Sequence, residues 1–150
     1  MIKLLEGNIL NSDCNIICQQ VNCKGVMGRG LALEIANRYP ELKRQYIEIC
    51  HTNNRHLIGT VFYYAVNSRQ YIANLFTQNN YGTQGVYTDY KALEKAIIDI
   101  KNTCLMNSFS VALPYKIGCG LGGGNWDTVY SIIMEAFEDS NILCKLYKYK

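Results

Sequence analysis

Short apolar runs alternate with amphipathic helical patterns along the chain, and this alternation limits the fold more than any other feature of the sequence. Runs typical of strands, several of them rich in Ile, Val, Phe and Tyr, lie at 2–5, 15–21, 60–66, 71–76, 110–113 and 142–147. Helical patterns fill most of the intervals between these runs. This order predicts a three-layer α/β fold in which strand ends and helix N-termini meet along one rim. Ligands of such folds usually bind at that rim.

The helical patterns are marked by apolar residues spaced three and four apart. Residues 31–50 contain Pro40, so we expect one helix that ends near Arg38 and a second that begins at Pro40, where proline is tolerated in the first turn. Two more apolar stripes predict helices within 88–105 and 125–140. Their members are Leu93, Ala96, Ile97, Ile100 and Cys104 in the first, and Val129, Ile132, Ile133, Ala136 and Phe137 in the second.

Composition predicts one soluble globular domain that covers residues 1–150. Hydrophobic residues make up 49% of the chain and charged residues 18%. No stretch approaches the roughly 20 apolar residues that span a bilayer, and no apolar segment is followed by a small-residue cleavage site. Seven cysteines without a CxxC pair or a zinc-ligand spacing fit reduced thiols. We therefore expect a cytoplasmic protein with no membrane partner and no metal.

The net charge of +3 is only mildly basic. A protein that binds duplex DNA usually carries a concentrated face of Lys and Arg side chains, and the sequence shows no such concentration. We expect no strong sequence-specific nucleic-acid binding. A few basic residues directed at one anionic ligand would account for the charge.

The most concentrated chemical signal is a run of five glycines within residues 118–124. It satisfies G-x-G-x-x-G, but a dinucleotide-binding unit also needs a second strand with an acidic ribose ligand about 20 residues further on. One helix and one strand fill the remaining chain, so an oxidoreductase is disfavoured. Successive backbone amides without Cβ atoms still favour a phosphate-bearing ligand. The alternative is a tight turn that needs positive φ at several positions.

A second glycine-rich loop follows the predicted strand at 15–21. Gly25, Gly28 and Gly30 precede a helix that we expect to begin near Leu31. Two strand-to-helix loops of this kind in one small domain predict the two sides of a diphosphate cleft. Neither loop ends in G-K-[ST], which disfavours an ATPase or a kinase.

With these loops the chain resembles the macrodomains, a family that binds ADP-ribose. The resemblance rests on GNIL at 7–10, VNCKGVMGRGLALEI at 21–35, RYPELKRQY at 38–46, NLFTQNNYG at 74–82, TDYKAL at 88–93, ALPYKIGCGLGGGNWDTV at 112–129 and KLYKY at 145–149. Within the family it is most similar to the branch of terminal ADP-ribose protein glycohydrolases, DNA-directed antitoxin macrodomains and the fungal ADP-ribose-1''-phosphate phosphatase. The resemblance implies a three-layer α/β/α fold with a central mixed sheet of about six strands, a monomer, and no cofactor.

The resemblance also implies a binding site for ADP-ribose or an ADP-ribosylated macromolecule. Asn8 and Ile9 stand where the family holds adenine, and Tyr147 stands where an aromatic ring flanks it. Asn22 stands where the family holds the distal ribose. A turn cap for Asn8, a core position for Tyr147 and a strand-end role for Asn22 are the alternatives. The loops would bind the diphosphate through Gly25, Val26, Met27, Gly28, Gly30, Leu31, Thr77, Ile117, Gly118, Cys119, Gly120, Leu121, Gly122 and Gly123.

Two departures from the family pattern bear on catalysis. Glycohydrolases of this branch use a Lys after the F-T segment and an Asp after G-C-G-L, and here Gln78 and Gly122 occupy those positions. The position of the phosphatase His is taken by Gln19. A water held between the distal ribose and the diphosphate offers another route, with Asn22 and Gln78 as candidate catalytic residues.

Other chemical groups near the loops have ordinary structural explanations. Asp89 and Asp127 belong to predicted first helical turns, where the helix dipole alone favours an acid. His51 and His56 lie in a polar loop outside any motif, and Cys119 has no neighbouring base, although its place near a helix N-terminus could lower a thiol pKa. Three functions remain: removal of ADP-ribose from modified protein or nucleic acid, non-catalytic reading of ADP-ribose, and ADP-ribose-1''-phosphate phosphatase activity.

Overall fold

A mixed sheet forms the centre of the computed structural model, which describes residues 1–52 and 55–149. Within these residues six strands pair in the order β1-β6-β5-β2-β4-β3. Neighbouring strands run parallel except for β3, which pairs antiparallel with β4 at one edge. The strands are β1 (Ile2–Glu6), β2 (Ile16–Asn22), β3 (Val61–Asn67), β4 (Gln70–Gln78), β5 (Val111–Pro114) and β6 (Cys144–Lys148).

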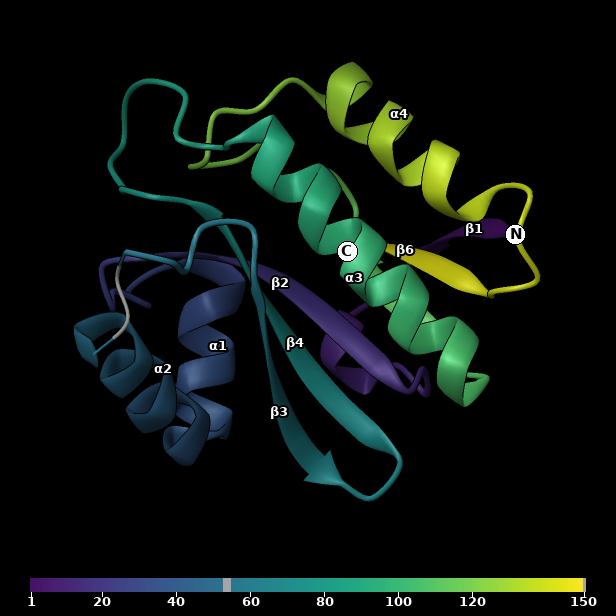
Figure 1. The fold of residues 1–150 in the computed structure, drawn as a ribbon, viewed down its shortest axis with the longest axis horizontal. Helices are drawn as coiled ribbons and strands as arrows, with labels where there is room; N and C mark the ends of the chain where they lie inside the picture. Colours follow the sequence, from purple (N-terminus) through teal and green to yellow (C-terminus); the bar gives the residue numbers. More distant parts are fainter. Residues whose placement is uncertain (53–54, 150) are drawn as a thin grey trace.

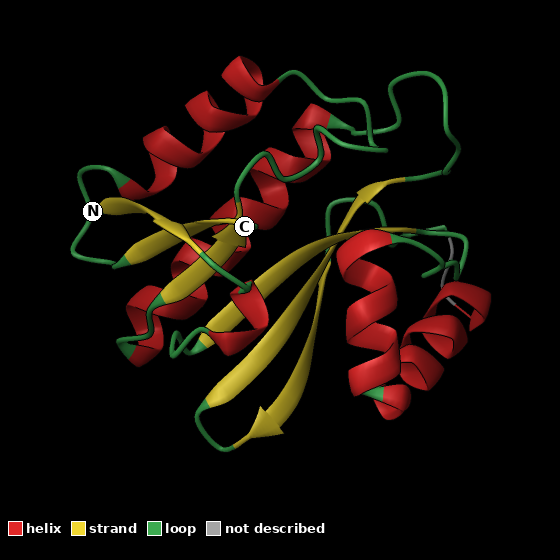
Figure 2. Cartoon of the chain, turned by 180° about the vertical axis from the view of Figure 1, so that it is seen from behind, coloured by secondary structure: helices red, strands yellow, loops and turns green. Residues whose placement is uncertain are grey.

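Helices cover both faces of this sheet (Figure 1). On one side α1 (Gly30–Arg38) packs with α2 (Pro40–Thr52), and on the other side α3 (Tyr90–Asn107) packs with α4 (Trp126–Phe137). Figure 2 shows the same two pairs from behind. A 3₁₀ turn, η1 (Ile9–Asn11), follows β1. The three-layer α/β/α fold expected from the sequence is confirmed.

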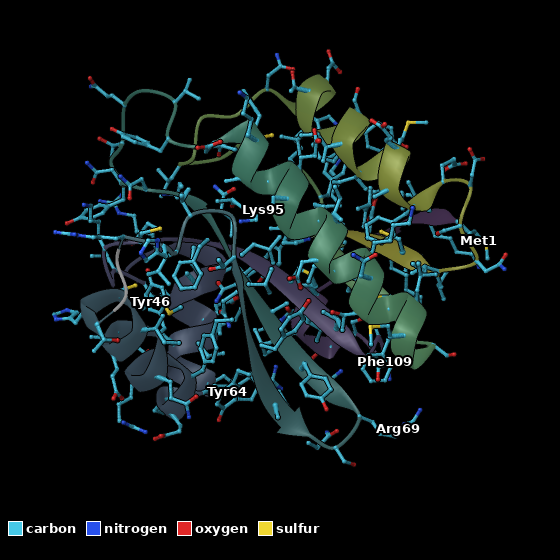
Figure 3. All side chains as sticks on the ribbon, in the orientation of Figure 1. Met1, Tyr46, Tyr64, Arg69, Lys95 and Phe109 are labelled. Atoms are coloured by element: carbon cyan, nitrogen blue, oxygen red, sulfur yellow. The ribbon has the colours of Figure 1, made fainter. Side chains whose placement is uncertain are left out.

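Two apolar cores lie on either side of β2, whose residues are buried on both faces of the sheet. Ile16 packs into the core beneath α3 and α4, whereas Ile17 packs into the core beneath α1 and α2. Successive side chains of a strand point to opposite faces, so a strand covered on both sides appears in the sequence as a continuous apolar run. In the second core Tyr46 of α2, labelled in Figure 3, stacks on Phe76 of β4, and ring centroids of the pair lie 5.9 Å apart.

Local signals set the helix ends close to the positions that the sequence predicts. Pro40 begins α2 directly after α1 ends, and Asp89 and Asn125 cap α3 and α4 by accepting hydrogen bonds from Ala92 N and Thr128 N. The six predicted strands and four predicted helices are present with small shifts at their ends. The turn η1 was not predicted, because three residues are too few to show a helical period. Among the described residues no helix is both long and apolar enough to cross a membrane.

The parallel strands bring their carboxyl ends to one edge of the sheet. The chain leaves β2 into residues 23–29, β4 into residues 79–89 and β5 into residues 115–125, so three loops far apart in sequence meet there. Figure 1 shows the second and third of these loops running together next to the start of α3. The amides of Tyr87 and Thr88 donate to Gly122 O at 2.7 and 3.0 Å. This edge is the rim at which the sequence predicts a ligand.

Candidate functional site

Two adjoining hollows open at this edge of the sheet. The larger has a volume of about 550 Å³ and is lined by residues from all three loops. The smaller, of about 350 Å³, is lined in part by residues that follow β1 and by Tyr147 of β6. Leu31 and Pro114 line both hollows, so the two form one continuous cleft. Its size falls in the range that accommodates small-molecule ligands.

Both glycine loops line the larger hollow. Val26 and Gly28 come from the loop after β2, and Gly118, Gly120 and Gly122 come from the loop after β5. The prediction that two loops far apart along the chain form opposite sides of one cleft therefore agrees with the structure.

The first glycine loop, residues 23–29, is organised by Asn22 at the end of β2. Asn22 Nδ2 donates to Val26 O at 2.9 Å, and Asn22 Oδ1 accepts from Lys24 N at 2.9 Å. The Tyr46 hydroxyl lies 2.7 Å from Asn22 O and 2.9 Å from Asn22 Oδ1. Burial raises the pKa of Tyr46, so this hydroxyl remains a donor. An amide carries two Nδ2 hydrogens, and Val26 uses one of them, which leaves the second for another acceptor.

The helix α1 begins at the cleft without a side-chain cap. Its N-cap residue, Arg29, makes no side-chain capping bond, in contrast to Asp89 and Asn125 at the starts of α3 and α4. The first amides of a helix have no partner within the helix, and Leu31 and Ala32 of this first turn line the larger hollow. These amides and the helix dipole together favour an anion at this position.

The second glycine loop, residues 115–125, is too tight for side chains at four of its glycines, Gly118, Gly122, Gly123 and Gly124. Gly118 has φ of +77°, a left-handed conformation that favours glycine. At Gly122 a Cβ atom would lie 2.6 Å from Thr88 Oγ1 and 2.7 Å from Gly118 O. Gly124 N donates to Gly118 O at 2.8 Å and closes the loop on itself. The two interpretations of this run, a tight turn and a ligand-binding loop, are therefore compatible.

A relay of neutral side chains connects the second glycine loop to β2 and β4. Thr88 Oγ1 donates to Gly118 O at 2.7 Å and accepts from Gln20 Nε2 at 3.0 Å. Gln20 Nε2 also donates to Gln78 Oε1 at 2.7 Å, and Gln20 Oε1 accepts from Thr77 Oγ1 at 2.6 Å. Gln20 and Gln78 both line the larger hollow. Amides and hydroxyls thus occupy the region where the related glycohydrolases are expected to hold a lysine and an aspartate.

The charge lining the larger hollow is positive. Among the described residues its charged members are Arg29 and Lys116, both of them cations. Cationic side chains and free backbone amides in one concave surface attract phosphate groups. The electrostatics of this half of the cleft therefore suit a diphosphate.

The smaller hollow is rich in aromatic side chains. Its lining includes Asn8, Ile9, Tyr115, Tyr147 and Tyr149. Asn8 Oδ1 accepts a hydrogen bond from Leu10 N at 2.9 Å, so Asn8 does cap the turn η1. A carboxamide oxygen has a second lone pair, which leaves an acceptor for a ligand amine. Glu34 also lines this hollow, and aromatic walls with these acceptors suit a purine base.

Most of the residues predicted to bind the ligand line the cleft. They are Asn22, Val26, Gly28, Gln78, Ile117, Gly118, Gly120, Leu121 and Gly122 in the larger hollow, Asn8, Ile9, Gly30 and Tyr147 in the smaller hollow, and Leu31 in both. Gly30 is the first residue of α1, although the sequence placed it in the loop before the helix.

The remaining predicted residues, Gly25, Met27, Thr77, Cys119 and Gly123, lie outside the lining. Met27 is buried in the core beneath α1 and α2, and Thr77 is fully buried beside Gln20. We expected these two residues to bind the ligand. Because their side chains are buried, they support the loops from below and do not reach a ligand through the side chain. Gly25 packs toward α2, where a Cβ would contact Cys50 Cβ at 3.7 Å.

The candidate nucleophiles and bases outside the relay do not reach the cleft. Burial raises the pKa of Cys119, an effect that Lys116 partly opposes, so the helix terminus does not activate this thiol as its position in the sequence suggested. Asp127, His51 and His56 are exposed and line neither hollow. In residues 1–52 and 55–149 no three His, Cys, Asp or Glu side chains gather as a metal site would require.

Several lining residues were missed from the sequence, among them Gln20, Arg29 and Lys116. Gln20 carried a weak signal, since it is polar within an otherwise apolar strand pattern next to Asn22. The sequence indicated that a few basic residues would face an anion. It did not identify them, because a cation in a loop points either to solvent or to ligand depending on the folded backbone.

Comparison with known proteins identifies a family and several relatives of this chain. The family model described as Macro domain matches residues 18–133 of the chain. The DNA ADP-ribosyl glycohydrolase of Mycobacterium tuberculosis is 30% identical over 142 residues, which cover 92% of this chain and 39% of that protein. The ADP-ribose 1''-phosphate phosphatase of Lodderomyces elongisporus is 31% identical over 146 residues, covering 88% of this chain and 90% of that protein. The chain thus spans well under half of the mycobacterial relative.

Solved structures share the fold. The macrodomain of Mycobacterium tuberculosis DarG superposes with a TM-score of 0.84 at 28% identity, over 98% of this chain and 97% of that one. A protein of unknown function from Bacteroides thetaiotaomicron superposes with a TM-score of 0.88 at 23% identity, over 99% of this chain and 98% of that one. At that identity the second likeness shows the fold alone.

Proposed function

Because the chain belongs to the macrodomain family, we propose that it binds ADP-ribose in the cleft between its two glycine loops and hydrolyses ADP-ribosyl linkages on a modified protein or nucleic acid. The observation that carries this proposal is that both loops line one hollow with two cations and no lining carboxylate among the described residues. The diphosphate would lie between the loops, near Arg29 and Lys116. Adenine would lie in the aromatic hollow beside Asn8, and the distal ribose near Asn22.

The hydrolysis proposed here proceeds by direct attack of water. A water oxygen attacks C1'' of the distal ribose, the bond from C1'' to the leaving oxygen breaks, and that oxygen departs with the electron pair while the water proton passes to solvent. Asn22 and Gln78 orient the ribose, and the loops fix the diphosphate, so the contribution of the protein is positioning. Neither amide can form a covalent adduct or take a proton at neutral pH.

This site favours linkages whose leaving group departs as a stable anion. A carboxylate leaving group, whose conjugate acid has a pKa of about 4, needs no protonation. A nucleobase or guanidino leaving group needs a proton donor, and the larger hollow is lined by no Asp, Glu or His among the described residues. Ester-linked ADP-ribose is therefore the preferred substrate, and turnover is slow because general acid catalysis is missing.

A non-catalytic reader is the second candidate, and a specific observation favours it. Gln78 and Gly122 replace the lysine and aspartate that the family resemblance assigns to catalysis, and Gly122 has no room for a side chain. Such a module would bind ADP-ribosylated targets, or sequester free ADP-ribose, without cutting the linkage.

Phosphatase activity is the third candidate, because the fungal relative is named ADP-ribose 1''-phosphate phosphatase. Gln19 stands where that enzyme is expected to have its His. Its Nε2 donates to Asn74 Oδ1 at 2.7 Å in the buried interior. A carboxamide cannot serve as a base, which makes this activity the weakest of the three.

Calorimetric titration with ADP-ribose and AMP tests the binding site. ADP-ribose should bind at least tenfold more tightly than AMP, because AMP lacks the diphosphate and the distal ribose that the larger hollow would hold. Equal affinities would mean that the glycine loops do not hold a diphosphate, and the proposal would fail.

Release of ADP-ribose distinguishes a hydrolase from a non-catalytic reader. The protein is incubated with three substrates: protein ADP-ribosylated on carboxylates, ADP-ribosylated DNA, and ADP-ribose-1''-phosphate. Free ADP-ribose or phosphate is measured over time against a sample without enzyme. We expect release from the carboxylate ester first. Tight binding of ADP-ribose without release from any substrate would identify a non-catalytic reader. Release of phosphate alone would identify the phosphatase.

Two further features belong to this proposal. We propose that the protein is a monomer, and size-exclusion chromatography with light scattering tests that state. The seven cysteines are free and six of them are buried, which fits the proposed cytoplasmic setting.

A further inference from the structure

The carboxamide of Gln78 lines the larger hollow, and what it presents to a ligand depends on which way it faces. One face of a carboxamide donates hydrogen bonds and the other accepts them. The relay beneath the hollow decides between these two orientations. We propose that Gln20 is a positioning residue that turns the Gln78 amide so that its N–H group, and not its oxygen, faces the ligand.

The orientation of Gln20 follows from its two threonine partners. A threonine hydroxyl has one proton, and Thr88 Oγ1 donates that proton to the backbone oxygen of Gly118 at 2.7 Å. Thr88 must therefore accept from Gln20, whose Nε2 lies 3.0 Å away. On the opposite side of the same amide Thr77 Oγ1 donates to Gln20 Oε1 at 2.6 Å. Thr77 Oγ1 also lies 3.3 Å from Leu75 O, so the Thr88 hydroxyl, whose proton goes to Gly118 O, is the group that a flipped Gln20 would face with an oxygen where a donor is required.

The orientation of Gln78 follows from that of Gln20. The second Nε2 hydrogen of Gln20 points to Gln78 Oε1 at 2.7 Å, so this oxygen is turned toward Gln20. Gln78 Nε2 donates one hydrogen to Asn80 O at 2.8 Å. The other Nε2 hydrogen of the half-buried Gln78 remains for the hollow. The chain of bonds from Gly118 O thus ends in a neutral donor at the cleft.

A neutral donor in this place recognises an oxygen acceptor of the ADP-ribosyl group, either a phosphate oxygen or an oxygen of the distal ribose. It does not recognise a group that must itself donate. This role rests on the proposed binding of ADP-ribose, and it gives Gln78 a binding function that does not depend on whether the protein turns over its ligand.

The test measures ADP-ribose affinity by calorimetry for single variants. Gln78→Leu removes the donor and should weaken binding about tenfold. Gln20→Met keeps the side-chain length but frees the Gln78 amide to rotate, and should weaken binding about fivefold. Thr77→Val removes one of the bonds that orient Gln20 and should act in the same direction, about twofold.

The double variant Gln20→Met/Gln78→Leu separates positioning from general support of the fold. If Gln20 acts only through Gln78, the double variant should bind no more weakly than Gln78→Leu alone, about tenfold below the unmodified protein. If Gln20 only supports the loops, the two effects should multiply to about fiftyfold. Multiplying effects, or an unchanged affinity of Gln20→Met, would overturn the proposal.

Gln70→Met is the matched control. Gln70 lies at the other end of β4 and donates through Nε2 to Ser12 O and Cys14 O, both at 3.0 Å, so its loss removes a similar pair of bonds away from the cleft. Its affinity for ADP-ribose should not change, while thermal unfolding shows how far each variant is destabilised. If the unmodified protein itself fails to bind ADP-ribose, the proposed function falls. If it binds and only the variants disagree, the positioning role of Gln20 alone falls.

Discussion

The two glycine loops look alike in the sequence and are held in different ways in the structure. The loop after β2 is held by one buried side chain, Asn22, which bonds to Lys24 and Val26 and is bonded in turn by Tyr46. The loop after β5 is held mainly by close packing of backbone, since at Gly122 no Cβ fits. Glycines in the first loop leave space around the polar side chain of Asn22, whereas those in the second allow backbone to contact backbone.

This difference predicts that the two loops fail differently. The first should lose stability when a polar side chain is removed, and it should tolerate a methyl group at Gly28, where φ is not positive. The second should be intolerant of the methyl group itself. Both should lose affinity for ADP-ribose when they are disturbed, because each contributes one side of the cleft.

The largest effect is expected for Gly122→Ala. Its Cβ would lie 2.6 Å from Thr88 Oγ1 and 2.8 Å from Gln20 Nε2, so the second loop must shift and the relay must break. The free energy of unfolding should fall by about 3 kcal/mol, and binding of ADP-ribose should be lost. Urea denaturation and calorimetry measure the two quantities. A variant that keeps both near their original values would show that the second loop is not packed as described.

Asn22→Ala should have the next largest effect. It removes the buried Oδ1 that accepts from Lys24 N and the Nδ2 that donates to Val26 O, while the Tyr46 hydroxyl keeps its bond to the backbone oxygen at this position. The free energy of unfolding should fall by about 2 kcal/mol. Affinity for ADP-ribose should fall about tenfold, because the loop loses its shape and the ligand loses an amide N–H. The same two measurements apply, and unchanged affinity would remove Asn22 from the site.

Tyr46→Phe removes fewer of the hydrogen bonds around Asn22 than Asn22→Ala does. The ring and its stacking on Phe76 remain, and the variant loses only the hydroxyl bonded to Asn22. A decrease in the free energy of unfolding of about 1 kcal/mol is expected, with a small loss of affinity. Since Tyr46 lies below the loop, a large loss of affinity without loss of stability would contradict its structural role.

Gly28→Ala is the matched comparison for Gly122→Ala and should have the smallest effect. The nearest atom to a Cβ at this position is Val26 Cγ1 at 4.0 Å, an ordinary contact. The free energy of unfolding should stay within about 0.5 kcal/mol of the original value. If Gly28→Ala were as damaging as Gly122→Ala, the two loops would be held in the same way and the comparison between them would fail.

The fold was largely predictable because its signals are local. The short apolar runs of the strands, the spacing of apolar residues in the helices, and the proline at position 40 act over a few neighbouring residues. The turn η1 was missed because three residues carry no period. The glycine loops were identified because an unusual density of glycine is visible without knowledge of the fold.

The candidate site was predictable in part. Gly118 and Gly122 were assigned correctly to the lining, whereas Thr77 was placed in contact with the ligand and is instead buried beside Gln20. Along a strand, neighbouring residues face opposite sides, and an error of one position moves a side chain from the cleft to its support. The sequence therefore placed the motif residues in the right segment of the chain, but it did not show toward which side of the strand each side chain points.

The sequence by itself determined the order of strands and helices, the presence of two loops suited to phosphate, and the replacement of the expected catalytic lysine and aspartate by Gln78 and Gly122. Only the tertiary structure decided that the loops line one hollow, that Arg29 and Lys116 supply its charge, and that Gln20 joins Gln78 to the second loop. The reason is physical: propensities and spacing act between neighbours in the chain. A cleft and a hydrogen-bond relay are made by groups that become neighbours only when the parallel strands bring their ends to one edge.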